Sequence, residues 1–130
     1  MRFVQYANGD WQLLADNKPY VIKGITYGIA KVGTSPDDGT LKSWMDYDYN
    51  NNGKCDGPYD SFIDANGNNK QDRDEPSVGD FELMKRMGVN TIRLYHQPFP
   101  IRKPILQDLY RRFGIRVIMV DFLGKYALGS

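Results

Sequence analysis

Cysteine is almost missing from this sequence of 130 residues. Cys55 is the single one, so no disulfide can form within the chain, and no histidine lies near it in sequence to activate its thiol. Long apolar runs are missing too, because segments such as 115–123 fall short of the about 20 residues that cross a bilayer. The opening Met1-Arg2-Phe3 lacks the apolar core of a signal peptide. We therefore expect no membrane partner and no disulfide framework.

Net charge is nearly absent as well, at +1. Lysine and arginine are scattered singly, without the basic block that favours nucleic-acid binding, so we expect no nucleic-acid partner. The acids are not scattered, since residues 37–75 hold ten Asp and Glu against four Lys and Arg. The length fits one domain, residues 1–130, with an acidic segment in its middle.

Three zones follow one another along the chain. Residues 3–27 predict β-structure, with a hairpin turn at Asn8-Gly9, a second turn at Asp16-Asn17, and a strand near 21–27. Residues 30–76 are rich in Gly, Asn and Asp and show no sustained period, which is typical of a functional insertion. The remaining third contains two copies of a helix-to-strand unit.

The two copies align residues 83–94 with residues 109–120. In each, a short amphipathic helix ends at a glycine, Gly88 or Gly114, and a β-branched strand follows, near 91–95 and 117–121. Ser77 is a candidate N-cap for the first helix, and Pro104 suits the first turn of the second. Strands alternating with helices predict an α/β fold with parallel strands.

The strongest site signal is a twelve-residue stretch, 64–75, that matches an EF-hand-like calcium loop. Calcium takes about six to eight oxygen ligands, which such a loop supplies from positions 1, 3, 5, 7, 9 and 12. Asn69 occupies position 6, where glycine is usual, and asparagine tolerates the left-handed conformation better than most residues. The expected ligands are Asp64, Asn66, Asn68, the Lys70 carbonyl, Asp72 and Glu75.

A weaker copy runs from 48 to 60. It has Gly53 at position 6, but Tyr59 stands at position 12 and Asp60 comes one residue late, so its closing ligand is open. The expected ligands are Asp48, Asn50, Asn52, the Lys54 carbonyl, Asp56 and Asp60.

The alternative for both stretches is a pair of solvated Asn/Gly/Asp turns, which are common in loops. We favour one or two Ca²⁺ ions that clip the insertion in place, because bound metal can order a loop without its own core. Structural calcium favours an extracellular or periplasmic location. The nearby Trp44, Tyr47, Tyr49, Tyr59 and Phe62 would either stack on sugars or form a small core under the loops.

If the parallel strands belong to a barrel, chemistry is expected at their C-terminal ends. Tyr27, Arg93, Tyr95, His96 and Asp121 lie there in the sequence. Alternation along the second strand turns Ile92 and Leu94 toward the helices and Arg93 toward the interior. Each residue also has an ordinary role: Arg93 in an ion pair, His96 as a loop residue, Asp121 as a helix cap.

Several of these residues resemble a known family. Asn90, Arg93, His96 and Pro98 reproduce the Asn-x-x-Arg-x-x-His-x-Pro pattern of family-two β-galactosidase and β-glucuronidase barrels. Residues 88–95 are similar to Gly-Val-Asn-Thr-Ile-Arg-x-Tyr of fungal-type β-1,3-glucanosyltransferases. The resemblance covers residues 18–125 and implies the N-terminal third of a clan A glycoside hydrolase TIM barrel, here with a calcium-loop insertion unlike those families.

The resemblance implies about three β/α units of a partial (β/α)8 barrel, preceded by a β-hairpin. It also implies that Arg93 lies beside the nucleophilic glutamate and that His96 contacts sugar. Tyr95 is the tyrosine of the second motif, whereas no motif fixes Tyr27 or Asp121. Retaining hydrolysis needs two carboxyl groups about 5 to 5.5 Å apart. In this family they follow strands 4 and 7, which lie outside these residues, so we expect the chain alone to be inactive.

Two further possibilities stay open. The chain could be a non-catalytic, calcium-dependent binding or assembly module, or a complete small α/β fold with an unrelated activity. A barrel interior open at both edges also predicts self-association or pairing with a complementary fragment. With the rest of a barrel present, carbohydrate is the expected partner.

Overall fold

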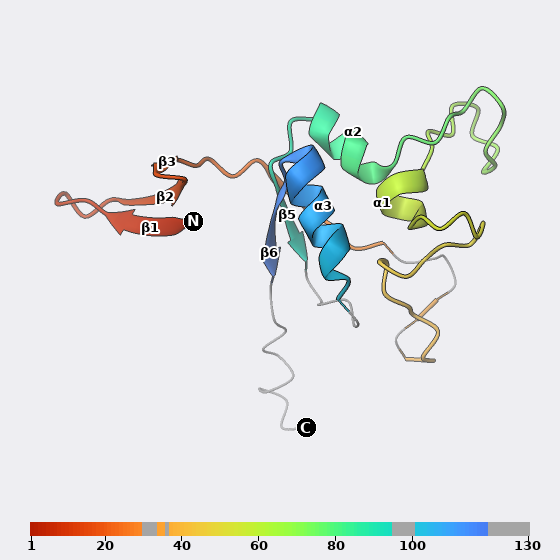
Figure 1. The fold of residues 1–130 in the computed structure, drawn as a ribbon, viewed down its shortest axis with the longest axis horizontal. Helices are drawn as coiled ribbons and strands as arrows, with labels where there is room; N and C mark the ends of the chain where they lie inside the picture. Colours follow the sequence, from red (N-terminus) through yellow and green to blue (C-terminus); the bar gives the residue numbers. More distant parts are fainter. Residues whose placement is uncertain (30–33, 36, 95–100, 120–130) are drawn as a thin grey trace.

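The computed structural model describes residues 1–29, 34–35, 37–94 and 101–119. Its first part is an antiparallel sheet of strands β1 (Arg2–Gln5), β2 (Trp11–Ala15) and β3 (Lys18–Pro19), in that order. Asp16 and Asn17 both have positive φ, 52° and 62°, as the tight turn between β2 and β3 requires. The expected hairpin is therefore present, and a short third strand extends it. This sheet lies at one end of the molecule (Figure 1).

The second sheet is parallel and has the order β4-β5-β6. Its strands are β4 (Gly24–Thr26), β5 (Thr91–Leu94) and β6 (Arg116–Met119), with Ile25, Ile92 and Val117 in register. Strand β4 is shorter than the expected 21–27. At its start, the backbone of Val21 and Lys23 is hydrogen-bonded to the Asn90 side chain. Lys23 N donates to Asn90 Oδ1 at 2.9 Å, and Asn90 Nδ2 donates to the Val21 carbonyl at 2.8 Å.

Helices α2 (Asp80–Arg86) and α3 (Lys103–Phe113) connect these strands. Gly88 and Gly114 have φ of 79° and 73°, so both predicted helix ends are confirmed. Pro104 lies in the first turn of α3, also as expected. The N-cap prediction at Ser77 is wrong, because α2 begins later, with Gly79 as its N-cap. The N–H groups of Val78 and Gly79 donate to the Ser61 carbonyl, which holds them out of the helix.

One hydrophobic core joins the insertion to the β/α units. Phe81 is fully buried, and its ring meets those of Tyr27, Trp44 and Phe113 at centroid distances of 6.0, 6.3 and 5.6 Å. Figure 1 shows α1 (Asp56–Asp60), inside the insertion, next to α2. The buried core residues are Tyr27, Trp44, Met45, Tyr47, Phe81, Met84, Ile92, Leu94, Ile105, Leu109 and Ile115.

The arrangement is an α/β fold with an open sheet. Parallel strands linked by helices are what three β/α units would form, and the closed (β/α)8 barrel stays a prediction. Within the described ranges, no helix is long and apolar enough to cross a membrane.

Candidate functional site

Loop 64–75 folds around its own side chains. Asp64 Oδ1 accepts hydrogen bonds from the N–H groups of Gly67 and Asn68, at 2.8 and 3.1 Å, and its Oδ2 accepts one from Asn69 N at 2.8 Å. Asn68 Oδ1 accepts from Lys70 N at 2.7 Å. Gly67 and Asn69, positions 4 and 6, have φ of 73° and 61°, so asparagine takes the left-handed conformation at position 6 as expected.

Glu75 closes this loop from position 12. Glu75 is only 4% exposed. Its two carboxylate oxygens accept hydrogen bonds from Ala65 N and Asp72 N at 2.7 and 3.0 Å. None of the ion pairs found among the described residues involves Glu75. A buried carboxylate without a cation is costly. The loop therefore holds a negative charge that a cation would compensate.

Loop 48–60 repeats this conformation over its first six positions. Asp48 accepts from Asn52 N and Gly53 N at 3.0 and 2.9 Å, as Asp64 accepts from the N–H groups at positions 5 and 6 of its own loop. Positive φ again falls on positions 4 and 6, at Asn51 (56°) and Gly53 (82°). The two stretches thus share a turn over positions 1 to 6, and they differ afterwards, because residues 56–60 form a helix and residues 72–75 do not.

The asparagine amides of loop 48–60 contact the carboxylate of Asp60. Asn50 Nδ2 and Asn52 Nδ2 donate to Asp60 Oδ2 at 2.6 and 2.8 Å. The Asn50 amide is the main reason why the pKa of Asp60 lies below its usual value. Tyr59, at position 12, turns away, and its hydroxyl donates to Asp108 on α3 at 2.8 Å.

The same role falls to Asp72 in loop 64–75. Asp72 Oδ2 accepts from Asn66 Nδ2 and Asn68 Nδ2, both at 2.7 Å. Asp72 at position 9 of loop 64–75 thus accepts the same pair of amide hydrogen bonds that Asp60 at position 13 accepts in loop 48–60.

Asp56 then takes the place that Glu75 holds in the other loop. Asp56 Oδ2 accepts from Tyr49 N at 3.0 Å, just as Glu75 accepts from the N–H at position 2. Asp56 Oδ1 is buried and has no hydrogen-bond partner among the described residues. That part of the chain contains no cluster of three or more carboxylate, imidazole or thiol groups, so a cation in either loop would also need amide and carbonyl oxygens.

The expected sugar-contacting residues are only partly described. Ile92 and Leu94 are fully buried against the helices, as predicted, and Arg93 between them is exposed, which places it on the opposite face of the sheet. Tyr95, His96 and Asp121 lie outside the described residues. Their convergence with Arg93 therefore stays a prediction.

Tyr27 lies in the core rather than on that opposite face. It is 7% exposed, and its hydroxyl donates to Asp80 Oδ2 at 2.8 Å, while Ser61 Oγ donates to Asp80 Oδ1 at 2.6 Å. Burial, reinforced by Asp80, raises the pKa of the Tyr27 hydroxyl well above its usual value. In this structure Tyr27 ties the end of β4 to α2 and the insertion.

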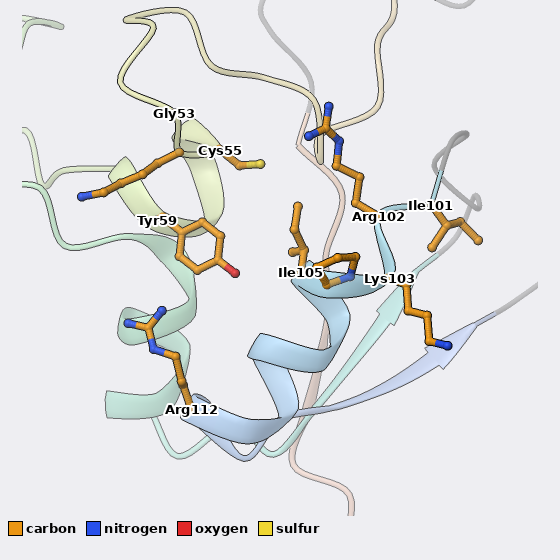
Figure 2. Close-up of a pocket in the computed structure, with 10 residues that line it drawn as sticks. Gly53, Cys55, Tyr59, Ile101, Arg102, Lys103, Ile105 and Arg112 are labelled. Carbon is orange, nitrogen blue, oxygen red and sulfur yellow. The ribbon is translucent and has the colours of Figure 1, made fainter.

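The structure also forms a pocket of about 680 Å³ between loop 48–60 and the start of α3 (Figure 2). No local sequence pattern indicates this pocket, because its lining residues, such as Cys55 and Ile105, lie far apart in the chain. The Cys55 thiol donates to the Met45 carbonyl at 2.9 Å, and burial raises its pKa, so it is poorly reactive. The pocket's arginines, Arg102 and Arg112, pair with Asp46 and Asp108. Lys54 and Lys103 add two further cations to the lining, so the wall of this pocket carries a net positive charge.

A second pocket, of about 400 Å³, lies between the two loops. It combines two carboxylates, two amides and two aromatic rings, a mixture that no local sequence pattern announces. Its lining residues are Tyr49, Asn50, Asp56, Gly57, Asp60, Ser61, Phe62 and Gln71.

Comparison of the chain with protein-family models, with curated proteins and with solved structures gives no match in any of the three.

Proposed function

We propose that this chain is the N-terminal portion of a calcium-binding glycoside hydrolase or transglycosylase. Buried Glu75, 4% exposed and closing loop 64–75 without a cationic partner among the described ion pairs, is the observation that carries the calcium part. Two backbone N–H groups already stabilise the Glu75 carboxylate, and a divalent cation would add the counter-charge that the described ion pairs do not supply.

The residues present fit such an ion. Calcium prefers oxygen, and the loops offer carboxylate, amide and carbonyl oxygens without sulfur or imidazole. The ion in loop 64–75 would be held by Asp64, Asn66, Asn68, the Lys70 carbonyl, Asp72 and Glu75. The ion in loop 48–60 would be held by Asp48, Asn50, Asn52, the Lys54 carbonyl, Asp56 and Asp60.

Bound calcium would act as a clip for the insertion. The last five residues of loop 48–60 form α1, and Tyr59 on α1 packs its ring on Phe81 at a centroid distance of 5.4 Å. Ordering the loops would therefore stabilise the shared core, since the binding free energy adds to the free energy of unfolding.

The glycosidase part is supported by the parallel sheet. Arg93 is exposed on the face away from the helices, which is the face that a barrel turns inward. Tyr95, His96 and Asp121 would join it at the strand ends if further β/α units close the barrel. Because the two catalytic glutamates of the family belong to later strands, the chain by itself should not cleave glycosides.

A non-catalytic, calcium-dependent binding module is favoured by one observation. The pocket between the loops, with Tyr49 and Phe62 in its lining, needs no barrel for its formation. Turnover of chromogenic glycosides by the chain joined to its remaining units would support the enzyme, and calcium-dependent glycan binding without turnover would support the module.

Calorimetric titration of Ca²⁺ into chelator-treated protein tests the calcium proposal. We expect heat from one or two sites and a rise in the thermal midpoint, whereas Mg²⁺ at the same concentration should have a smaller effect because it dehydrates reluctantly. No heat and no stabilisation at millimolar Ca²⁺ would rule the proposal out.

A further inference from the structure

The pocket between the two calcium loops has the chemistry of a site for a neutral, polyhydroxyl molecule. Its volume of about 400 Å³ is in the range of small-ligand pockets, which is about 300–1,000 Å³. Its polar lining consists of the Asn50 and Gln71 amides, which donate to Asp60 and to the Glu75 carbonyl, and of the Asp56 and Asp60 carboxylates. Asp56 Oδ1 is a buried acceptor without a partner among the described residues. No lysine or arginine is part of this described lining, so an anion would be repelled.

Two aromatic residues complete this pocket. Tyr49 is 49% exposed and stacks on Tyr47, with ring centroids 5.2 Å apart at 27°, and Phe62 is half-buried. Aromatic rings offer flat apolar surface at little cost in conformational entropy. A sugar ring presents a matching apolar face of C–H groups and hydroxyls around its rim.

The two loops differ in how completely their carboxylates are satisfied. Both Glu75 oxygens accept hydrogen bonds from the backbone of their loop, whereas the corresponding Asp56 leaves Oδ1 buried and without a partner among the described residues. Loop 48–60 also lacks a glutamate at position 12 that could offer two oxygens to one ion. The six ligands named for loop 48–60 would leave up to two of the about six to eight positions of a calcium ion for a ligand. The pocket adjoins the loop through Asn50, Asp56 and Asp60.

We infer that the pocket beside loop 48–60 is a calcium-dependent binding site for one sugar residue. Two neighbouring hydroxyls of the sugar bind the calcium ion, and its apolar face lies on Tyr49 and Phe62. This inference rests on the proposed calcium binding, and it assigns a ligand to one loop while loop 64–75, closed by Glu75, stays structural.

Saturation-transfer NMR on the full chain tests the site with methyl α-D-mannopyranoside as the probe. We expect transfer to the sugar in the presence of Ca²⁺, its loss on addition of a chelator, and no transfer to a tetrahydropyran without hydroxyls. Calorimetry on the same samples reports calcium uptake separately.

Tyr49→Ala and Phe62→Ala should each weaken sugar binding by about tenfold, because each removes one stacking surface. Both variants should still take up calcium, which also shows that they fold. Tyr49→Phe retains the aromatic ring and should bind the sugar as the unaltered chain does. Trp11→Ala, which removes an aromatic ring 65% exposed on β2, is the matched control.

The outcomes separate the two proposals. Calcium uptake without transfer, or transfer that survives the chelator, overturns the sugar site and leaves calcium binding intact. Absence of calcium uptake refutes the calcium proposal itself. Equal loss of transfer in Trp11→Ala and Tyr49→Ala would place the sugar elsewhere and also overturn the inference.

Discussion

Single carboxylates decide how each loop can hold a cation. Glu75 and Asp56 both accept the N–H at position 2 of their loops, and Asp72 and Asp60 both accept two asparagine amides. The roles are conserved between the loops although the positions are exchanged. Glu75 makes this contact from position 12 and Asp56 makes it from position 9.

Glu75→Gln should abolish or weaken one of the two calcium uptake events. The change removes a negative charge from a buried ligand, and the affinity of such loops depends on ligand charge, so we expect a loss on the order of tenfold or more. Calorimetric titration measures it.

Glu82→Gln is the matched control, since Glu82 makes a surface ion pair with Arg86 at 3.1 Å on α2. This control should bind calcium like the unaltered chain because exposed helix pairs contribute little. Unchanged uptake in Glu75→Gln would show that loop 64–75 does not depend on its closing carboxylate.

At the scale of elements, the junction between α1 and α2 is the tightest backbone contact. Gly79 has φ of 82°, and a Cβ there would lie 2.7 Å from both the Pro58 carbonyl oxygen and Tyr59 Cα. Both neighbours are backbone atoms and cannot rotate away. The site therefore requires glycine for its conformation and for its space.

Gly79→Ala should lower the free energy of unfolding by about 2–4 kcal/mol, through left-handed strain and backbone overlap together. Gly9→Ala serves as the comparison, because Gly9 has φ of 92° but nothing within 4 Å of the added carbon. It should cost only about 1 kcal/mol, from strain alone. Urea unfolding of the two variants measures the difference, and equal losses would contradict the close approach.

Sequence patterns were sufficient for elements with their own signals. A glycine in the left-handed conformation ends each unit at Gly88 and Gly114, and β-branched runs mark β5 and β6. The start of α2 could not be predicted, because it depends on the Ser61 carbonyl, a partner within another element. Helix α1 is too short to show a period, and its place follows from burial of Pro58 and packing against α2.

The candidate site also has a part that local sequence predicts and a part that depends on contacts between distant segments. Loop spacing was enough to nominate both calcium stretches, since their ligands are close in sequence. Asp60 was named from the sequence as well, but the role of Tyr59 required the structure, because its hydroxyl donates to Asp108 on α3. Tyr27 was placed at a strand end correctly, but whether its side chain faces sugar or core depends on Asp80 and on the aromatic cluster.

At the scale of the whole molecule, the parallel sheet has two unpaired edges in its described part, β4 and β6. Its helices cover one face, and parallel sheets are usually covered on both. Ile118, 39% exposed and in register with Arg93, lies on the uncovered face of β6. We expect the chain to self-associate through this sheet unless further units cover it.

Ile118→Lys should weaken this association by on the order of tenfold, because it places a charge in the apolar contact. Met87→Lys, at a residue 72% exposed after the end of α2, is the control and should leave association unchanged. Sedimentation velocity over a range of concentrations measures both. A monomer at every concentration would refute the expectation.

The shared core has a consequence for any shortening of the insertion. Trp44 and Met45 are buried in the core that the following strands and helices form. The ring of Trp44 packs against the ring of Phe81 on α2. A deletion that rejoins the chain across 34–76 would therefore leave α2 with a bare aromatic surface in water. Because the insertion supplies Trp44, Met45, Tyr47 and Tyr59 to the same core as the β/α units, we expect its removal to expose part of that core and to destabilise α2.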